Sequence, residues 1–226
     1  MNSASLSAAD STLARPSQPD PVVFVVDDDI SVREALELLI RCTGSRVETF
    51  ASAEEFLLRE RPRTPSCVIL DLNLPDLNGL EVQERIAARG AGMPIIFVTA
   101  YGDVPATVRA MKAGAVEFLT KPLHEDLLLK AVEEAIRYSH VALAEELETR
   151  MIRDRYTLLS PRERQVMDLV VSGLLNKQVG GVLGISEITV KAHRARVMHK
   201  MNAGSLAELV KFVARLRRQD ARAGGA

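Results

Sequence analysis

The sequence is poor in several residue types, and each shortage excludes a class of protein. It has no Trp, and only 4% of its 226 residues are aromatic, which argues against a nucleic-acid surface built from stacked rings. Its two cysteines, Cys42 and Cys67, lie far apart without a CxxC pair. This excludes a disulfide framework or a cysteine-ligated zinc site and fits a reducing compartment. No run approaches 18 apolar residues, so we expect a cytoplasmic protein without a membrane partner.

What the chain does contain is typical of a globular protein with two domains. Hydrophobic residues make up 47% and charged residues 26%, and the length allows one large domain or two small ones. The net charge of -1 hides a split along the chain. Residues 21–125 carry 11 basic and 16 acidic side chains, whereas residues 156–226 carry 12 basic and 5 acidic ones. We therefore expect two domains with different partners, and nucleic acid as the candidate partner of the second.

The composition also predicts where these domains begin and end. Residues 1–20 are rich in Ser, Ala, Pro and Asp, with a single Arg and no apolar core. This composition predicts a loose tail rather than a signal peptide. The expected segments are a disordered tail at 1–20, a first domain at 21–125, a helical linker at 126–155, a second domain at 156–218 and a disordered tail at 219–226.

Short apolar runs alternate with helical patterns through the first segment. The predicted strands cover residues 22–26, 46–50, 67–70, 94–98 and 115–119. The runs 22–26 and 67–70 do not alternate with polar residues, as in strands buried on both faces of a parallel sheet. Five strands alternating with helices predict an α/β domain with a doubly wound five-stranded parallel sheet.

The residues that follow these strands predict the chemistry of the domain. Such sheets bind ligands at the carboxyl ends of their strands, and there the sequence places Asp27 and Asp28, Asp71, Thr99 and Lys121. Converging carboxylates repel one another unless a cation lies among them, and ligand sets made only of oxygen favour Mg²⁺. A lysine and a hydroxyl opposite the metal can hold phosphoryl oxygens, and a free carboxylate can accept the group as an acyl phosphate.

Three segments of this domain, VVFVVDDD, VILDLNLPDLNG and VTAYGDVPATVRAMKAGAVEFLTKP, resemble the receiver domain of bacterial two-component response regulators. The resemblance covers about residues 21–140. It implies that a sensor histidine kinase transfers a phosphoryl group to Asp71, and that the Lys121–Pro122 bond is cis. The implied Mg²⁺ ligands are Asp27, Asp28, Asp71 and the backbone carbonyl of Asn73. The implied phosphoryl-binding and switch residues are Thr99, Lys121 and Phe118.

The connector between the two domains has two interpretations. No Gly or Pro occurs between Leu123 and Ser160, and apolar residues recur mostly at spacings of three, four or seven. One interpretation is a helix that continues the last receiver helix and carries a seam for a partner chain. The other is a packed final helix followed by a short disordered hinge.

The basic segment contains the signals of a helix-turn-helix. Ser160-Pro161 begins one helix, a second runs from about Asn176 to Leu183, and a turn at Gly184 leads to a third from Ser186 to about Met201. The third helix is rich in basic residues, and a further cap at Ser205 begins a fourth helix. Two short helices joined by a glycine turn, the second of them basic, predict DNA binding.

The segment LSPRERQVMDLVVSGLLNKQVGGVLGISEITVKAHRARVMHKM strongly resembles the four-helix DNA-binding domain of the LuxR type, as joined to receivers in FixJ-like and NarL-like regulators. The resemblance covers about residues 156–218 and places the third helix in the major groove of promoter DNA. Taken alone, each basic side chain here is better explained as a solvated helix charge. The implied DNA contacts are Asn176, Lys177, Glu187, Thr189, Lys191, Arg194, Ala195 and Lys200.

One departure from this pattern is the pair Gly180-Gly181 inside the second helix, which costs roughly 1–2 kcal/mol of helix stability relative to Ala. Either close packing demands small residues there, or the helix becomes ordered only on DNA.

Together these features predict a phosphorylation-activated transcription regulator and not an enzyme. We expect it to form a homodimer when phosphorylated, and contact with RNA polymerase is a further expectation. One alternative is a phosphatase of the aspartyl-phosphate type, but such enzymes need an acid two residues after the nucleophile, where this chain has Asn73. The other is a constitutive DNA-binding protein with an inactive receiver, against which the complete set of receiver residues argues.

Overall fold

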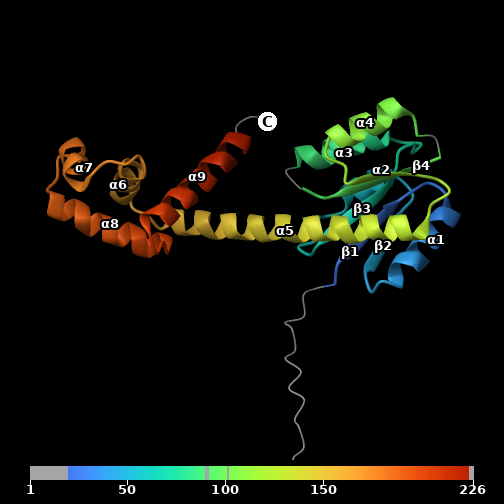
Figure 1. Ribbon diagram of the computed structural model, residues 1–226, viewed down its shortest axis with the longest axis horizontal. Coiled ribbons are helices and arrows are strands. Elements are labelled where there is room, and N and C mark those ends of the chain that lie inside the picture. The colour runs from blue at the N-terminus through green and yellow to red at the C-terminus, as the bar shows by residue number, and fades with distance from the viewer. Residues whose placement is uncertain (1–19, 90–91, 101, 224–226) are drawn as a thin grey trace, which may run out of the picture. The chain divides into compact units, whose positions relative to one another are not determined.

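The computed structural model describes residues 20–89, 92–100 and 102–223 of the chain (Figure 1). The chain divides into two compact units, Met1–His140 and Val141–Ala226. Of the tail expected at residues 1–20, all but Asp20 lies outside the described residues. Within the described ranges, no helix is both long enough and apolar enough to cross a membrane. Cys42 and Cys67 are both free thiols, in line with the expected absence of a disulfide.

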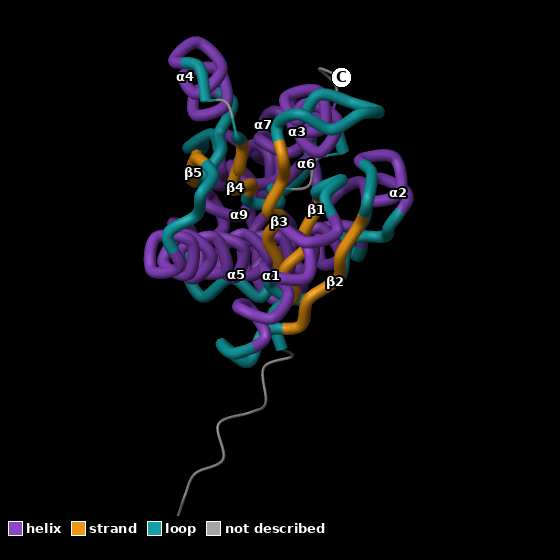
Figure 2. Tube along the Cα trace, turned by 90° about the vertical axis from the view of Figure 1, so that its right-hand side faces the viewer, coloured by secondary structure: helices purple, strands orange, loops and turns teal. Residues whose placement is uncertain are grey.

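The first unit is built on a five-stranded sheet in which every pair of neighbouring strands is parallel. Its strands are β1 (Val22–Val26), β2 (Arg46–Phe50), β3 (Ser66–Asp71), β4 (Ile95–Thr99) and β5 (Glu117–Thr120). Figure 2 shows them side by side in the order β2-β1-β3-β4-β5. Every residue of β1, β3 and β4 is buried, because helices cover both faces of the sheet. The predicted doubly wound α/β fold is confirmed.

The two faces of the sheet carry different helices. The helices are α1 (Ile30–Arg41), α2 (Ala53–Leu58), α3 (Gly79–Ala88), α4 (Val104–Lys112) and α5 (Glu125–Thr157). Alternate residues of β1 point to opposite sides, so Val23 packs with Leu36 of α1 and Leu128 of α5, whereas Phe24 packs with α2 and α3. The chain order reverses between β1 and β3, and this switch point is where open sheets of this kind bind ligands.

Side-chain caps fix where the helices begin, close to the carboxyl ends of the strands. Asp29 accepts a hydrogen bond of 2.8 Å from the backbone N–H of Ser31 and begins α1. Ser52, Asn78 and Asp103 cap α2, α3 and α4 in the same way. Each cap satisfies a backbone N–H that the helix itself leaves unpaired. The capping residues Asp29 and Asp103 therefore lie only three and four residues past the ends of β1 and β4.

The connector is part of one continuous helix, α5, of 33 residues. Its first half belongs to the core of the first unit, where Leu128 and Val132 pack against the sheet, so this core extends past residue 125. Ser139 accepts a 2.9 Å hydrogen bond from the backbone N–H of Ser66 at the start of β3. Ile152, near the other end of α5, is buried in the second unit. The connector is helical as expected, and the alternative of a disordered hinge is wrong.

The second unit adds four helices to the end of α5. They are α6 (Pro161–Val171), α7 (Asn176–Leu183), α8 (Glu187–Met201) and α9 (Leu206–Ala223). Ser160 and Glu163 form a capping box at the start of α6. The tail expected from residue 219 is wrong for residues 219–223, because α9 continues to Ala223. No Gly or Pro occurs between Leu206 and Gly224, which is why the helix does not end earlier.

The two glycines of α7 play different roles. A Cβ at Gly180 would lie 2.7 Å from the carbonyl oxygen of Ile185, in the turn that leads to α8. A Cβ at Gly181 would meet nothing within 4 Å. Close packing therefore accounts for Gly180 but not for Gly181.

Replacing each glycine by alanine should change the stability of the second unit in opposite directions. Gly180→Ala should destabilise the second unit by about 1–3 kcal/mol, because the backbone of the turn must move. Gly181→Ala should stabilise it by up to about 1 kcal/mol, because alanine favours the helix and the site is open. Urea unfolding of the full-length variants, followed by circular dichroism, measures both effects. Equal effects of the two substitutions would contradict the packing argument.

Candidate functional site

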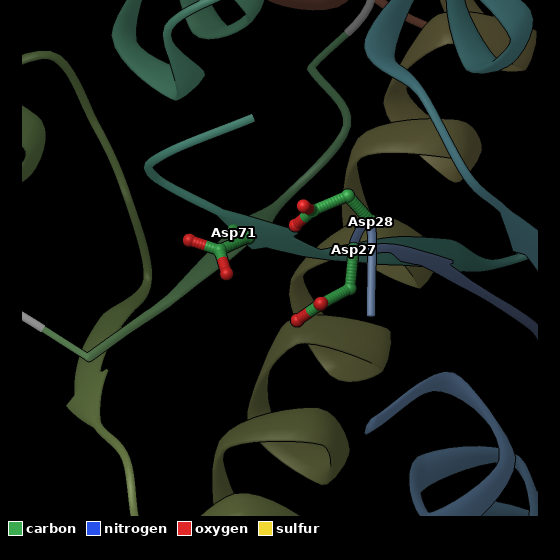
Figure 3. Close-up of side chains that lie close together, drawn as sticks. All are labelled: Asp27, Asp28 and Asp71. Atoms are coloured by element: carbon green, nitrogen blue, oxygen red, sulfur yellow. The ribbon is translucent and has the colours of Figure 1, made fainter. Parts of the chain in front are cut away.

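Three carboxylates meet at the switch point of the sheet (Figure 3). Asp27 and Asp28 follow β1, and Asp71 is the last residue of β3, the strand paired with β1. One oxygen from each carboxylate lies within 4.8 Å of the others. Asp27 and Asp71 are buried, with 2% and 7% of their surface exposed, whereas Asp28 is exposed. The cluster is therefore open to solvent on the side of Asp28.

Lys121 neutralises part of this charge. It follows β5, next to a cis bond to Pro122, and its Nζ lies 2.7 Å from Oδ2 of both Asp27 and Asp71. Burial raises the pKa of Asp27, although the hydrogen bond from Lys121 opposes this shift. Burial also opposes the charge of Lys121, but hydrogen bonds to two carboxylates outweigh it and raise the pKa of the ammonium group. One ammonium group shared by two carboxylates, with a third carboxylate nearby, leaves net negative charge at the site.

The donor set fits a hard divalent cation. The three converging side chains offer only carboxylate oxygens, the ligands that Mg²⁺ prefers. The exposed side of Asp28 leaves room for the several waters that Mg²⁺ usually keeps. A divalent cation among these oxygens would also favour the charged form of Asp27, against the effect of its burial.

The loop after Asp71 connects the acidic cluster to Thr99. The backbone N–H of Asn73 donates to Oδ1 of Asp71 at 2.9 Å, and its side-chain amide donates to Oγ1 of Thr99 at 3.2 Å. Thr99 is fully buried at the end of β4. A Cβ at Gly79, the first residue of α3, would lie 2.8 Å from the carbonyl oxygen of Asp71. A glycine at this position therefore lets α3 begin directly against the end of β3.

Phe118, on β5, lies next to Gly102, three residues after Thr99. Its ring is partly buried, and its centroid lies 6.1 Å from that of Phe97. A Cβ at Gly102 would lie 3.1 Å from the Phe118 ring and 3.2 Å from Thr120. The ring therefore packs closely against the loop that follows Thr99.

In the second unit, α7 and α8 form the expected helix-turn-helix. The turn contains Gly184 at a φ of 66°, a left-handed conformation that glycine adopts without strain. Ser186 then caps α8 by accepting from the backbone N–H of Thr189. Five of the expected DNA contacts are exposed in this unit: Lys177, Glu187, Thr189, Lys191 and Ala195.

Three other expected DNA contacts are paired inside the unit. Arg194 is half-buried, and its Nη1 donates to Oδ1 of Asn176 at 2.6 Å. Lys200 donates to Oε2 of Glu163 at 2.6 Å and to the carbonyl of Leu158 at 3.1 Å. Arg194 and Lys200, two of the expected DNA contacts, are thus paired with residues of the unit itself.

Helical phase explains these two pairings. Arg194 lies four residues after the buried Val190 and three before the buried Val197, so it faces the core. Lys200 adjoins the buried Met201 and reaches Glu163, of which only 3% is exposed. The hydrogen bond from Lys200, with another from the backbone of Ser160, lowers the pKa of Glu163. This ion pair, formed across 37 residues, has no signal in the local sequence.

The phase of α8 also exposes side chains that are not among the expected DNA contacts. They are Ile188, Ala192, Arg196 and His199. A helical projection of Ser186–Met201 would have found them, since they lie opposite the apolar residues that pack on α6 and α7.

Comparison with known families agrees with the geometry of both units. The family model described as the response regulator receiver domain matches residues 23–133. The family model described as bacterial regulatory proteins, luxR family, matches residues 157–213. The chain belongs to the response regulators that join a receiver domain to a LuxR-type DNA-binding domain.

Similar proteins span nearly the same length. Nodulation protein W of Bradyrhizobium diazoefficiens is 47% identical over 191 residues, 84% of each chain. The transcriptional regulatory protein FixJ of the same organism is 41% identical over 193 residues, 85% of this chain and 94% of that one. A low-resolution structure of the response regulator StyR is 47% identical, covers 87% of this chain and 100% of its own, and has a TM-score of 0.74. These relatives are regulators, and the chain is a transcription regulator of the same family.

Proposed function

We propose that a sensor histidine kinase transfers a phosphoryl group to Asp71 and that this transfer controls how the second unit binds promoter DNA. The observation that carries the proposal is the position of Lys121, whose ammonium group lies 2.7 Å from both Asp27 and Asp71 at the open acidic cluster. An oxygen of Asp71 attacks phosphorus, the phosphorus–nitrogen bond of the phosphohistidine breaks, and an acyl phosphate remains on Asp71.

Asp27, Asp28, Asp71 and the backbone carbonyl of Asn73 would hold Mg²⁺ at this site. When bound, the ion would neutralise negative charge on the transferring phosphoryl oxygens. Lys121 would move from the free carboxylate of Asp71 to a phosphoryl oxygen, since the same ammonium group can pair with either anion.

Thr99 and Phe118 would carry the signal away from Asp71. Thr99 would exchange its hydrogen bond with Asn73 for one to the phosphoryl group. Phe118 packs beside the loop that follows Thr99, so a shift of this loop would give the ring a different rotamer. The result is a population shift between two packings of one surface, biased by the charge at one carboxylate.

The chemistry of the site favours a switch over a phosphatase acting on other substrates. Asn73 stands two residues after Asp71, where a general acid would be needed, and an amide cannot donate a proton as a carboxylic acid does. Loss of the phosphoryl group from Asp71 to water would reset the switch.

DNA would be bound by exposed side chains of α7 and α8. Lys177, exposed in the first turn of α7, would contact a phosphate, with Asn176 beside it. Glu187, Thr189, Lys191 and Ala195 are exposed along α8 and would face base edges. The 3.1 Å ion pair between Lys191 and Glu187 is solvated, so it holds Lys191 only weakly. The protein would work in the cytoplasm, where promoter DNA is found.

Selection from a random-sequence DNA library tests this function. The full-length protein, treated with beryllofluoride and Mg²⁺ to mimic phosphorylation, should enrich one sequence motif. Failure to enrich any motif, with a protein shown to be folded, would contradict sequence-specific DNA binding.

Lys191 and Lys177 should differ in what they contribute to DNA binding. Lys191→Ala should weaken binding to the selected motif by about 1–3 kcal/mol and leave nonspecific binding nearly unchanged, because a base contact carries discrimination. Lys177→Ala should weaken both kinds of binding. It should also reduce the slope of log affinity against log salt concentration by about one, because phosphate contacts release counterions. Fluorescence anisotropy across a salt series measures both. If Lys191→Ala weakened both kinds of binding equally, Lys191 would be a phosphate contact instead.

Dimerisation would pair two second units on DNA. In the second half of α5, Leu147 and Met151 lie four residues apart and are 61% and 53% exposed, so they form an apolar seam without a partner in the described structure. We expect beryllofluoride and Mg²⁺ to convert monomers to dimers in sedimentation velocity. Leu147→Glu should weaken the dimer, whereas Leu38→Glu, at a leucine of α1 that is 71% exposed, should not. A protein that stays monomeric at concentrations at which it binds the selected DNA would contradict this part of the proposal.

We also propose that the DNA-bound regulator contacts RNA polymerase.

A further inference from the structure

The outermost ridge of α8 has an unusual composition for a helix that is proposed to bind DNA. Val190, Val197 and Met201 define its buried face. Successive residues of an α-helix turn by about 100°, so the ridge opposite this face consists of Ile188, Ala192, Ala195 and His199. All four are exposed, and Ile188 is 80% exposed, the highest value among the large apolar side chains of the second unit.

Over its first three positions, this ridge carries no hydrogen-bonding group. Ala192 and Ala195 end at Cβ, and Ile188 carries the only longer side chain among these three. The polar side chains of the same turns, such as Lys191, lie on the flanks of the ridge. A base edge opposite the centre of the ridge can therefore be contacted only by methyl and methylene groups.

Folding of the second unit does not account for an isoleucine at position 188. Its side chain is too exposed to contribute much to the core, which at this level of α8 is formed by Val190 with Val166, Val170 and Val179. Isoleucine is also a poorer helix former than alanine or lysine, so an exposed helical position gains nothing from it. At 80% exposure, the side chain of Ile188 is available for an apolar contact outside the unit.

The position of Ile188 specifies which partner. It is the second residue of α8, directly after the capped first residue Glu187. In a helix-turn-helix, the N-terminal residues of the second helix contact base edges in the major groove. Thymine is the only base of unmodified DNA that presents a methyl group there, and apolar side chains recognise it by contact. The two alanines that follow on the ridge leave space for the helix to approach the bases closely.

We propose that Ile188 is a specificity-determining residue that recognises the C5 methyl group of a thymine in the DNA site. The inference rests on the proposed DNA-binding function and adds to it a base and a chemical group.

A double substitution of protein and DNA tests this contact. The DNA motif enriched by the full-length protein is synthesised with each thymine replaced in turn by deoxyuridine, which removes only the C5 methyl group. At one position per half-site, the replacement should weaken binding by about fourfold, the effect of losing one buried methyl group. Ile188→Ala should remove this sensitivity at that position and leave the other positions unchanged.

A matched variant separates the contact from a general loss of affinity. Val182 of α7 is also β-branched and 62% exposed, so Val182→Ala removes similar apolar surface from the same helix-turn-helix. This variant should keep the full sensitivity to deoxyuridine. Because Ile188 is exposed, Ile188→Ala should fold, and thermal unfolding of the full-length protein checks that it does.

The outcomes distinguish failure of the thymine contact from failure of the proposed DNA binding. Equal deoxyuridine penalties in the wild type and in Ile188→Ala at every position would overturn the thymine contact while leaving DNA binding intact. Unchanged affinity of Ile188→Ala for the selected DNA would do the same. A selection that enriches no DNA would overturn the proposed function, and the contact with it.

Discussion

Asp71→Asn should accept no phosphoryl group from acetyl phosphate or from a sensor kinase. The amide of asparagine is too poor a nucleophile to form the acyl phosphate. The substitution keeps the shape of the side chain, and its carbonyl oxygen can still accept the hydrogen bond that Asp71 Oδ1 now receives from the backbone of Asn73. Intact-mass spectrometry after incubation with acetyl phosphate and Mg²⁺ should show the added mass of one phosphoryl group on the wild type and none on the variant.

A second carboxylate serves as the control for this result. Asp154 is an exposed residue of α5, and Asp154→Asn makes the same chemical change away from the acidic cluster. It should be phosphorylated as fully as the wild type. A complete phosphoryl adduct on Asp71→Asn would show that another residue is the acceptor.

Removal of Mg²⁺, or of one carboxylate that would hold it, should have the next largest effect. Chelation of divalent cations should abolish phosphorylation of the wild type, because the charge on the phosphoryl oxygens would then lack its main counterion. Asp28→Asn should raise the Mg²⁺ concentration needed for half-maximal phosphorylation by roughly 10–100-fold or more. Loss of a hydrogen bond that only supports a metal ligand already lowers metal affinity by that factor.

Asp28 is the informative member of the cluster because it has no ion pair with Lys121, unlike Asp27 and Asp71. Its replacement should therefore leave the thermal unfolding temperature of the metal-free protein unchanged or slightly raised, since one repelling charge is removed. Phosphorylation that proceeds at the wild-type rate in excess chelator would contradict a metal-dependent site.

The carboxyl-end rule for parallel sheets is what made the receiver site predictable. Asp27, Asp71, Thr99 and Lys121 each end or follow a strand with a clear apolar pattern, so their convergence follows from topology. The end of α7 and the start of α8 were predictable for a similar reason, since Gly184 and the Ser186 cap are local signals. Where the neighbouring sequence determines the structure, the prediction needs no knowledge of distant contacts.

Contacts between distant segments were not predictable in this way. The pairing of Arg194 with Asn176 and that of Lys200 with Glu163 depend on how α8 packs against α6 and α7. A basic side chain on a DNA-binding helix and one that holds the fold together look alike in sequence. The close approach of Gly180 to the carbonyl of Ile185 is likewise visible only once the turn is built. The apolar ridge at Ile188 could have been predicted from helical phase alone.

The proposed function requires that charge placed on Asp71 controls DNA binding by the same chain. The most direct test is the affinity of the full-length wild type and of Asp71→Asn for the selected DNA, with and without beryllofluoride and Mg²⁺. The wild type should bind about a hundredfold more tightly with the mimic, because pairing two second units multiplies their effective concentration on DNA. The affinity of Asp71→Asn should not change. Equal affinities of the wild type with and without the mimic, or an equal response of Asp71→Asn, would contradict the claim.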